Sequence, residues 1–237
     1  MRIEKLLSEL GVASRKDSAR AARAGAILVD GVVVRNAATH VDPEKCRITF
    51  FGRDIEYKKY VYVMLNKPEG YVSATDDKSL PYVTELLPDE LAARELFPMG
   101  RLDKDTTGLM ILTNNGGLSH TLLSPKRHVS KEYFFTAAEP LAIEAEKLFA
   151  DGVTLADGYE CKSARLTLSD DRTSGVIELT EGKYHQIKRM IASTSNRVVT
   201  LERISFATIP LDPTLGRGEW RYLTDEEIAV LELAAKQ

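Results

Sequence analysis

The segment GRLDKDTTGL, residues 100–109, has the residue types and spacing best suited to chemistry in this chain. It places two carboxylates, Asp103 and Asp105, in a short polar run that leads into an apolar one. Gly100 and Gly108 bracket the run and permit positive φ or a close backbone approach, so the loop can present a side chain. An ionised carboxylate there can act as a general base or a nucleophile. Alternatively, this loop is a solvated turn before a strand and has no part in chemistry. The spacing of the residues does not indicate which of the two carboxylates would react.

A tyrosine in a predicted strand is a second candidate. Lys131-Glu132-Tyr133 opens the strand expected over residues 131–138, and alternation puts Tyr133 and Phe135 on one face of the sheet. An aromatic ring at such a position can stack on a nucleobase, or it can belong to the core.

The run EGKYHQIKRM, residues 181–190, predicts the beginning of a helix. If Ile187 lies at the centre of the packed face, Lys188 lies at the edge of that face, whereas Arg189 points away from it. A cation at the edge of a buried face can reach into a cleft and keep a carboxylate ionised.

The elements that must position these groups begin with two N-terminal helices. Apolar residues spaced as in a helix predict the first over residues 3–10, which Gly11 ends. Ser14 and Asp17 form a capping pattern for the second, over residues 15–23. Its cations fall within an arc of roughly 140° and are Arg15, Lys16, Arg20 and Arg23. The second helix therefore has one cationic face.

The rest of the chain predicts an α+β fold. Two valine-rich runs around Asp30-Gly31 predict a hairpin, and the polar residues 52–60 are typical of a linker. Strands are expected over residues 60–65, 71–73, 109–112, 131–138, 163–168 and 175–180, with helices over 118–123, 141–149 and 225–235. Because strands often follow one another, an antiparallel-rich mixed sheet is favoured. The expected domains are residues 1–57 and 58–237.

Composition narrows the class of protein. The net charge of −3 is unevenly divided, with ten basic and eight acidic residues up to residue 57 and 22 against 27 beyond it. Cys46 and Cys161 lie far apart, and the four histidines lack metal-ligand spacing, so neither a disulfide nor a metal site is expected. No signal peptide or membrane span is apparent, and the cytoplasm is the expected location.

Several motifs resemble those of the pseudouridine synthases of the RsuA type. GRLDKDTTGL resembles the catalytic signature of that family, and the resemblance implies that Asp103 is the catalytic carboxylate. It further implies that Tyr133 stacks on the target base and that Lys188, where many members have arginine, pairs with Asp103. LNKPEGYVSATDD resembles another shared motif. Residues 1–50 resemble the S4 RNA-binding fold, so the expected architecture is a small S4-like domain followed by a larger synthase domain.

This resemblance implies conversion of uridine to pseudouridine in rRNA, without a cofactor. The branch that modifies one uridine of small-subunit 16S rRNA is favoured over the large-subunit 23S branch and over a non-catalytic S4-bearing RNA-binding or ribosome-assembly factor. The expected partner is rRNA or an assembling subunit, and a monomer is expected because heptads are absent. The expected RNA contacts are Arg2, Lys5, Arg15, Lys16, Arg20, Arg23, Arg35, Lys67, Arg101, Lys183, His185, Gln186 and Arg189.

Overall fold

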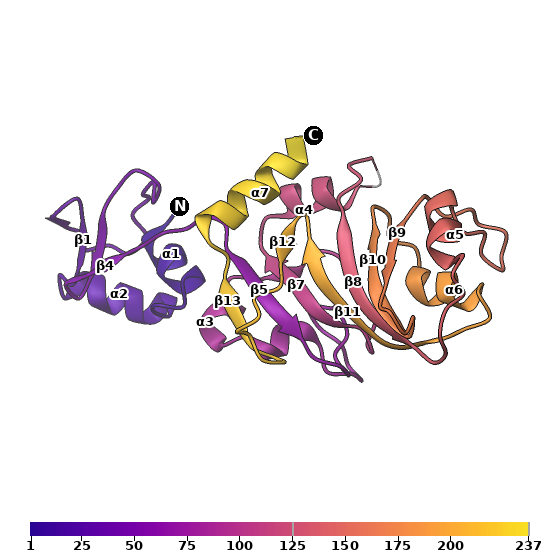
Figure 1. The fold of residues 1–237 in the computed structure, drawn as a ribbon. Coiled ribbons are helices and arrows are strands. Elements are labelled where there is room, and N and C mark those ends of the chain that lie inside the picture. The colour runs from indigo at the N-terminus through magenta and orange to yellow at the C-terminus, as the bar shows by residue number, and fades with distance from the viewer. Residues whose placement is uncertain (125, 237) are drawn as a thin grey trace. The chain divides into compact units, whose positions relative to one another are not determined.

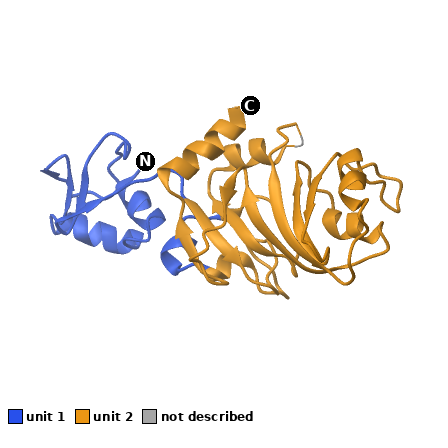
Figure 2. Cartoon of the chain, in the orientation of Figure 1, with its two compact units in different colours: residues 1–61, 87–96 blue, residues 62–86, 97–237 orange. Residues whose placement is uncertain are grey.

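The computed structural model describes residues 1–124 and 126–236, which divide into two compact units (Figure 2). The first unit comprises residues 1–61 and 87–96, and the second comprises residues 62–86 and 97–237. The expected domain boundary after residue 57 therefore lies four residues before the observed division. Residues 87–96 join the first unit because the Arg94 guanidinium donates to the carbonyl oxygens of Lys58 and Lys59.

The first unit packs two short helices on a small sheet. Helix α2 (Arg15–Arg23) begins and ends as the sequence predicts, and α1 (Ile3–Glu9) ends one residue before its predicted end. The Ser14 hydroxyl accepts the hydrogen bond of the Asp17 amide at 3.1 Å. The unit also contains α3 (Asp89–Ala92), β1 (Ile27–Val29), β2 (Val32–Val33), β3 (Ile48–Phe50) and β4 (Arg53–Ile55). Its antiparallel strands have the order β2-β1-β3-β4. Asp30 and Gly31 both have positive φ, as a tight hairpin turn requires.

The second unit is built on a nine-stranded sheet (Figure 1). Its strands are β5 (Tyr62–Lys67), β6 (Phe97–Pro98), β7 (Thr107–Thr113), β8 (Lys131–Ala137), β9 (Arg165–Leu168), β10 (Ser174–Leu179), β11 (Val198–Phe206), β12 (Ile209–Pro210) and β13 (Trp220–Tyr222). The main order is β13-β5-β7-β11-β8-β10-β9, with β6 on β7 and β12 on β11. Only the β7–β11 pair is parallel among these described strands. The predicted antiparallel-rich α+β fold is confirmed.

Four helices and one short turn pack on this sheet. They are α4 (Gly116–Leu123), α5 (Ala145–Asp151), α6 (Gln186–Ala192) and α7 (Asp225–Lys236), with a 3₁₀ turn η1 (Val83–Leu86). Figure 1 shows α4 and α7 together beside β5, β7 and β12, against which their apolar residues pack, and α5 and α6 at the end formed by β9 and β10. Within the described part of the chain, no helix has the length and apolar content needed to cross a bilayer.

Two predicted elements differ from the structure, and the strands that were not predicted are β3, β4, β6, β11, β12 and β13. Of these, β4 lies within residues 52–60, which the sequence suggested as a linker. Residues 71–73 form no strand, since only an isolated bridge joins Val72 to Tyr82. Helix α5 begins at Ala145 instead of residue 141, because the Leu141 amide donates to the Arg172 carbonyl oxygen. Strand β11 escaped prediction because Arg203, only 2% exposed, interrupts its apolar alternation with a charge.

Candidate active site

The loop before β7 presents its carboxylates at the centre of the sheet. Its N-terminal side is fixed by Ser73, whose hydroxyl donates to the Leu102 carbonyl oxygen and accepts from the Leu102 amide, at 2.8 and 2.9 Å. On the other side, Gly108 lies so close to β11 that a Cβ atom there would collide with the Arg203 carbonyl oxygen. The loop is therefore held at both ends, with the Asp103 side chain between them.

The buried side chain of Lys67 stabilises this loop through hydrogen bonds to its backbone. Its side chain is fully buried, and Nζ donates to the carbonyl oxygens of Pro68, Lys104 and Thr106 at 3.1, 3.2 and 2.7 Å. Burial lowers the pKa of Lys67 from 10.5 to about 8, although Asp105 and Asp103 act in the opposite direction. The expectation that Lys67 contacts RNA is wrong, because its ammonium group is enclosed and fully used by the loop.

Lys188 is bonded to both carboxylates of the loop. Its Nζ lies 3.0 Å from Oδ2 of Asp103 and 2.6 Å from Oδ1 of Asp105. Partial burial disfavours the ammonium form, but the bonds to Asp105 and Asp103 raise the pKa of Lys188 above its usual value. Partial burial also disfavours ionised Asp105, yet the hydrogen bond from Lys188 keeps its pKa below the usual range. The helix-face argument thus placed Lys188 where it can reach a carboxylate, but did not identify Asp105 as its second partner.

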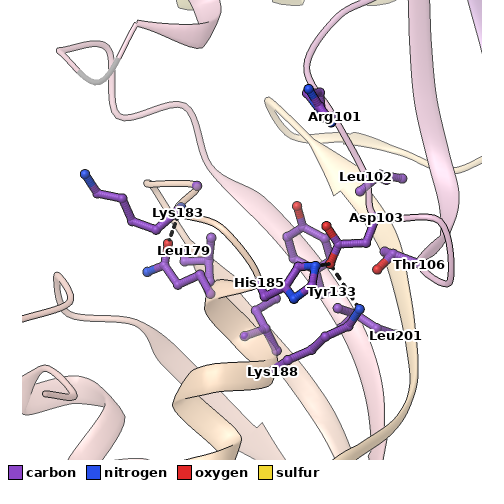
Figure 3. Close-up of a pocket in the computed structure, with 13 residues that line it drawn as sticks. Arg101, Leu102, Asp103, Thr106, Tyr133, Leu179, Lys183, His185, Lys188 and Leu201 are labelled. Atoms are coloured by element: carbon purple, nitrogen blue, oxygen red, sulfur yellow. Dashed lines mark hydrogen bonds and ion pairs between the residues drawn. The ribbon is translucent and has the colours of Figure 1, made fainter. Parts of the chain in front are cut away.

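His185 is the third group at Asp103. Its Nε2 lies 3.5 Å from Asp103 Oδ2 (Figure 3), although the sequence suggested an RNA contact and not a neighbour of the carboxylate. His185 precedes α6 and adopts a left-handed backbone with φ of 48°. Such a conformation is uncommon for a non-glycine residue, and periodicity cannot reveal it.

Tyr133 lines the same pocket as Asp103, His185 and Lys188 (Figure 3). Its side chain is 9% exposed and shares a sheet face with the fully buried Phe135, as alternation predicts. The sequence left open whether the Tyr133 ring belongs to the core or to a binding site. In the structure the ring is nearly buried on the sheet and also lines the pocket.

Glu181 anchors the segment that carries His185, a role that no pattern in the sequence indicates. Its carboxylate accepts from the Tyr159 hydroxyl at 3.0 Å, the Lys162 amide at 2.9 Å and the Gln186 amide nitrogen at 2.5 Å. Gln186 is 5% exposed, and its side-chain oxygen accepts from the Lys183 amide. Both ends of the Gln186 amide are thus used inside the protein, while the residue also lines the pocket, and its contact with RNA stays a prediction.

Thr106 has an unusual hydroxyl at the edge of this pocket. Among the described residues, its Oγ1 is the one buried side-chain nitrogen or oxygen without a hydrogen-bond partner. Such groups are rare in folded proteins because desolvating them is costly.

No cluster of three or more His, Cys, Asp or Glu side chains suited to a metal occurs in the part of the chain described.

The remaining expected RNA contacts occupy three environments. Arg101 and Lys183 line the pocket, and Figure 3 shows Lys183 extending away from Asp103. Arg189 is bound to Asp157, with Nη2 and Oδ2 2.5 Å apart. The others are exposed in the first unit and are Arg2, Lys5, Arg15, Lys16, Arg20, Arg23 and Arg35. Of these, Arg20 pairs with Asp17, while Arg15 and Lys16 form no ion pair with any described residue.

Two known protein families match this chain, one over each part of it. A profile described as RNA pseudouridylate synthase matches residues 61–193, which contain Asp103, Tyr133 and Lys188. The chain belongs to the RNA pseudouridylate synthase family. A second profile, the S4 domain, matches residues 1–45. The predicted family and the S4 module are confirmed, and the protein is an isomerase of the pseudouridine synthase type.

Relatives resemble this synthase along nearly its whole length. The chain is 42% identical over 234 residues to the uncharacterized RNA pseudouridine synthase YtzG of Bacillus subtilis, covering 98% of each. It is 41% identical to the ribosomal small subunit pseudouridine synthase A of Escherichia coli, over 97% of this chain and 99% of that protein. A crystal structure of a pseudouridylate synthase superposes with a TM-score of 0.69 at 35% identity, covering 98% and 99% of the two chains.

Proposed function

We propose that this synthase isomerises one uridine of small-subunit 16S rRNA, with Asp103 as its catalytic carboxylate. The observation that carries this proposal is the pocket in which Asp103, bonded to Lys188 at 3.0 Å, shares its lining with Tyr133. Full-length similarity to ribosomal small subunit pseudouridine synthase A supports 16S rRNA as the substrate.

Asp103, Lys188 and Tyr133 have different roles in the proposed reaction. Uridine isomerisation breaks the bond between C1′ and N1, turns the uracil and joins C1′ to C5, with no redox change. Ionised Asp103 either attacks the sugar or removes the C2′ proton to give a glycal. Lys188 holds that carboxylate in place through the 3.0 Å bond to Oδ2, and Tyr133 supports the detached base. Deuterium at C2′ separates the routes, because only proton removal gives a primary isotope effect.

The first unit supplies affinity in this proposal. The target base is stacked in folded RNA, and extruding it costs a few kcal/mol that contacts elsewhere must offset. The exposed cations of α2 suit the phosphate backbone because they match its charge without reading bases. We assign residues 1–57 to RNA binding and linkage, and residues 58–237 to catalysis, in a cytoplasmic monomer that acts on rRNA or an assembling subunit.

The decisive experiment maps pseudouridine in both rRNAs from cells with and without the gene. We expect one pseudouridine to disappear from 16S rRNA and to return with the wild-type chain, but not with Asp103→Asn. Loss of a 23S modification would move the enzyme to the large-subunit branch. An unchanged set of modifications would contradict catalysis and favour an RNA-binding or assembly factor.

A further inference from the structure

Tyr184 lies beside the active site but has no part in the chemistry described above. Its side chain is 76% exposed, the highest value among the large hydrophobic side chains of the described residues. The ring stacks on the imidazole of His185, with centroids 3.8 Å apart and planes inclined by 18°. Since His185 also lies 3.5 Å from Asp103, Tyr184 extends a row of side chains outward from the catalytic carboxylate.

Hydrogen bonds fix the backbone that carries this ring, and the stack on His185 orients the ring itself. The Lys183 amide donates to the Gln186 side-chain oxygen at 2.8 Å, and the Gln186 amide donates to the Lys183 carbonyl oxygen at 3.1 Å. These bonds close the turn around Tyr184, and Arg189 donates to its carbonyl oxygen at 3.5 Å. A preorganised aromatic surface loses little conformational entropy when a ligand binds to it.

Cations surround the hollow that Tyr184 lines. Arg101, Lys104 and Lys183 line it together with Tyr184, and its one lining carboxylate, Asp103, is already bonded to Lys188. No ion pair joins Arg101, Lys104 or Lys183 to an acidic residue within the described ranges. Lys183 Nζ does lie 4.7 Å from the centroid of the Tyr159 ring, a contact that leaves its charge in place. An aromatic face beside cations that no carboxylate neutralises is the combination that binds single-stranded nucleic acid, because bases stack and phosphates pair with the charges.

We infer that Tyr184 is a second stacking platform, which binds the base of a nucleotide adjacent to the target uridine while Arg101, Lys104 and Lys183 neutralise its phosphates. This inference rests on the proposed function for the nature of the substrate. One face of the Tyr184 ring is taken by His185, so the incoming base occupies the other. The extruded uridine and its neighbour then stack on different aromatic residues, Tyr133 and Tyr184, and this helps to keep the target out of its helix.

The test measures stacking directly. The full-length chain carrying Asp103→Asn, which cannot turn over RNA, is titrated with a short oligouridylate that contains one 2-aminopurine. We expect binding to quench its fluorescence, and Tyr184→Phe to retain the quench. Tyr184→Leu should remove most of it and weaken binding about tenfold, because base–aromatic stacking has that magnitude. Tyr222→Leu removes another exposed tyrosine that lines neither the pocket nor the hollow, and it should leave the quench unchanged.

A second probe separates stacking from a purely structural role. When an abasic sugar replaces the 2-aminopurine, the chain that retains Tyr184 and the chain that carries Tyr184→Leu should bind with equal affinity. If a difference in affinity persists, Tyr184 acts only by supporting His185, and the inference is overturned. Equal quenching by the Tyr184→Leu chain, or failure to bind the oligouridylate, would also overturn it. A Tyr184-dependent quench alongside unchanged rRNA modification would overturn the proposed function alone.

Discussion

Cations occupy opposite environments in the two units of this synthase. In α2, Arg15 and Lys16 are exposed and form no ion pair with the residues described, whereas Lys67 is fully buried and Lys188 is held by two carboxylates. An exposed cation keeps its hydration and acts through charge that salt screens. A buried cation is fixed by hydrogen bonds and therefore determines geometry. In the proposed function, this difference separates affinity for RNA from the positioning of the loop that carries Asp103.

Substitution of Asp103 should have the largest effect on activity, because buried Lys67 and half-buried Lys188 both hold its loop. Asp103→Asn is expected to lower kcat by at least about 10⁴-fold while changing the Kd for RNA by no more than about threefold, since the amide cannot act as base or nucleophile. Single-turnover assays and filter binding measure the two quantities.

Asp105→Asn is the matched control for that experiment. Asp105 bonds Lys188 at 2.6 Å, nearer than Asp103, but its side chain is 61% exposed against 31%. Activity should remain within about tenfold of the wild type, because Asp105 shares the cation without being the reacting group. The opposite ranking of the two variants would reassign the catalytic carboxylate.

The role of Lys67 as an internal brace can be tested through stability. Lys67→Met leaves three carbonyl oxygens without their donor, and we expect the free energy of unfolding to fall by about 3 kcal/mol or more. Urea titration measures the loss. Lys78→Met, at an exposed position, should change it by less than about 0.5 kcal/mol. Equal effects of the two substitutions would remove the distinction between buried and exposed lysines.

The cations of α2 should affect RNA affinity alone. Replacing Arg15 and Lys16 together by Gln should raise the Kd about tenfold at low salt and reduce the slope of log K against log salt concentration by about two. Maximal kcat should stay the same. Lys45→Gln removes a cation of the same unit that is already paired with Asp42 at 3.1 Å, so a smaller effect is expected. A lower kcat with an unchanged slope would contradict the division of roles.

A pH titration probes the buried cations with a smaller expected effect. Above pH 8 Lys67 loses a proton and has two N–H donors for three carbonyl oxygens, so kcat/KM should decline severalfold between pH 8 and 9.5. Lys131→Met removes a half-buried lysine whose pKa is likewise lowered to about 8, and this variant should keep the decline. Loss of the decline in that variant would assign it to Lys131.

Stability should change with pH in the opposite direction to activity. Between about pH 8 and 10.5 the unfolded chain still protonates Lys67, whereas the folded chain does not. The unfolded state therefore binds more protons, and the contribution of Lys67 to the free energy of unfolding rises with pH through this window. Lys131 contributes with the same sign. Urea titrations at pH 8 and 9.5, with Lys67→Met as the reference, measure this contribution.

Much of the fold could be predicted because its causes are local. The Ser14 cap, the Asp30-Gly31 turn and the apolar periodicity of α1 each depend on residues a few positions apart. Strand β11 could not be found in this way, since the buried charge of Arg203 is accommodated by a hydrogen bond to the Leu109 carbonyl oxygen, 94 residues away. Tertiary contacts override local pattern at such positions.

Motifs that resemble those of a known family, together with apolar periodicity, were enough to predict the family and the antiparallel-rich architecture, because both signals depend on residues close together in the chain. The folded chain was needed to establish that Lys67 lies inside the loop, that Lys188 joins Asp103 to Asp105, and that His185 turns toward the same carboxylate. Those contacts link segments 37 to 85 residues apart, and the free energy of such pairs depends on burial and distance, which no spacing along the chain records.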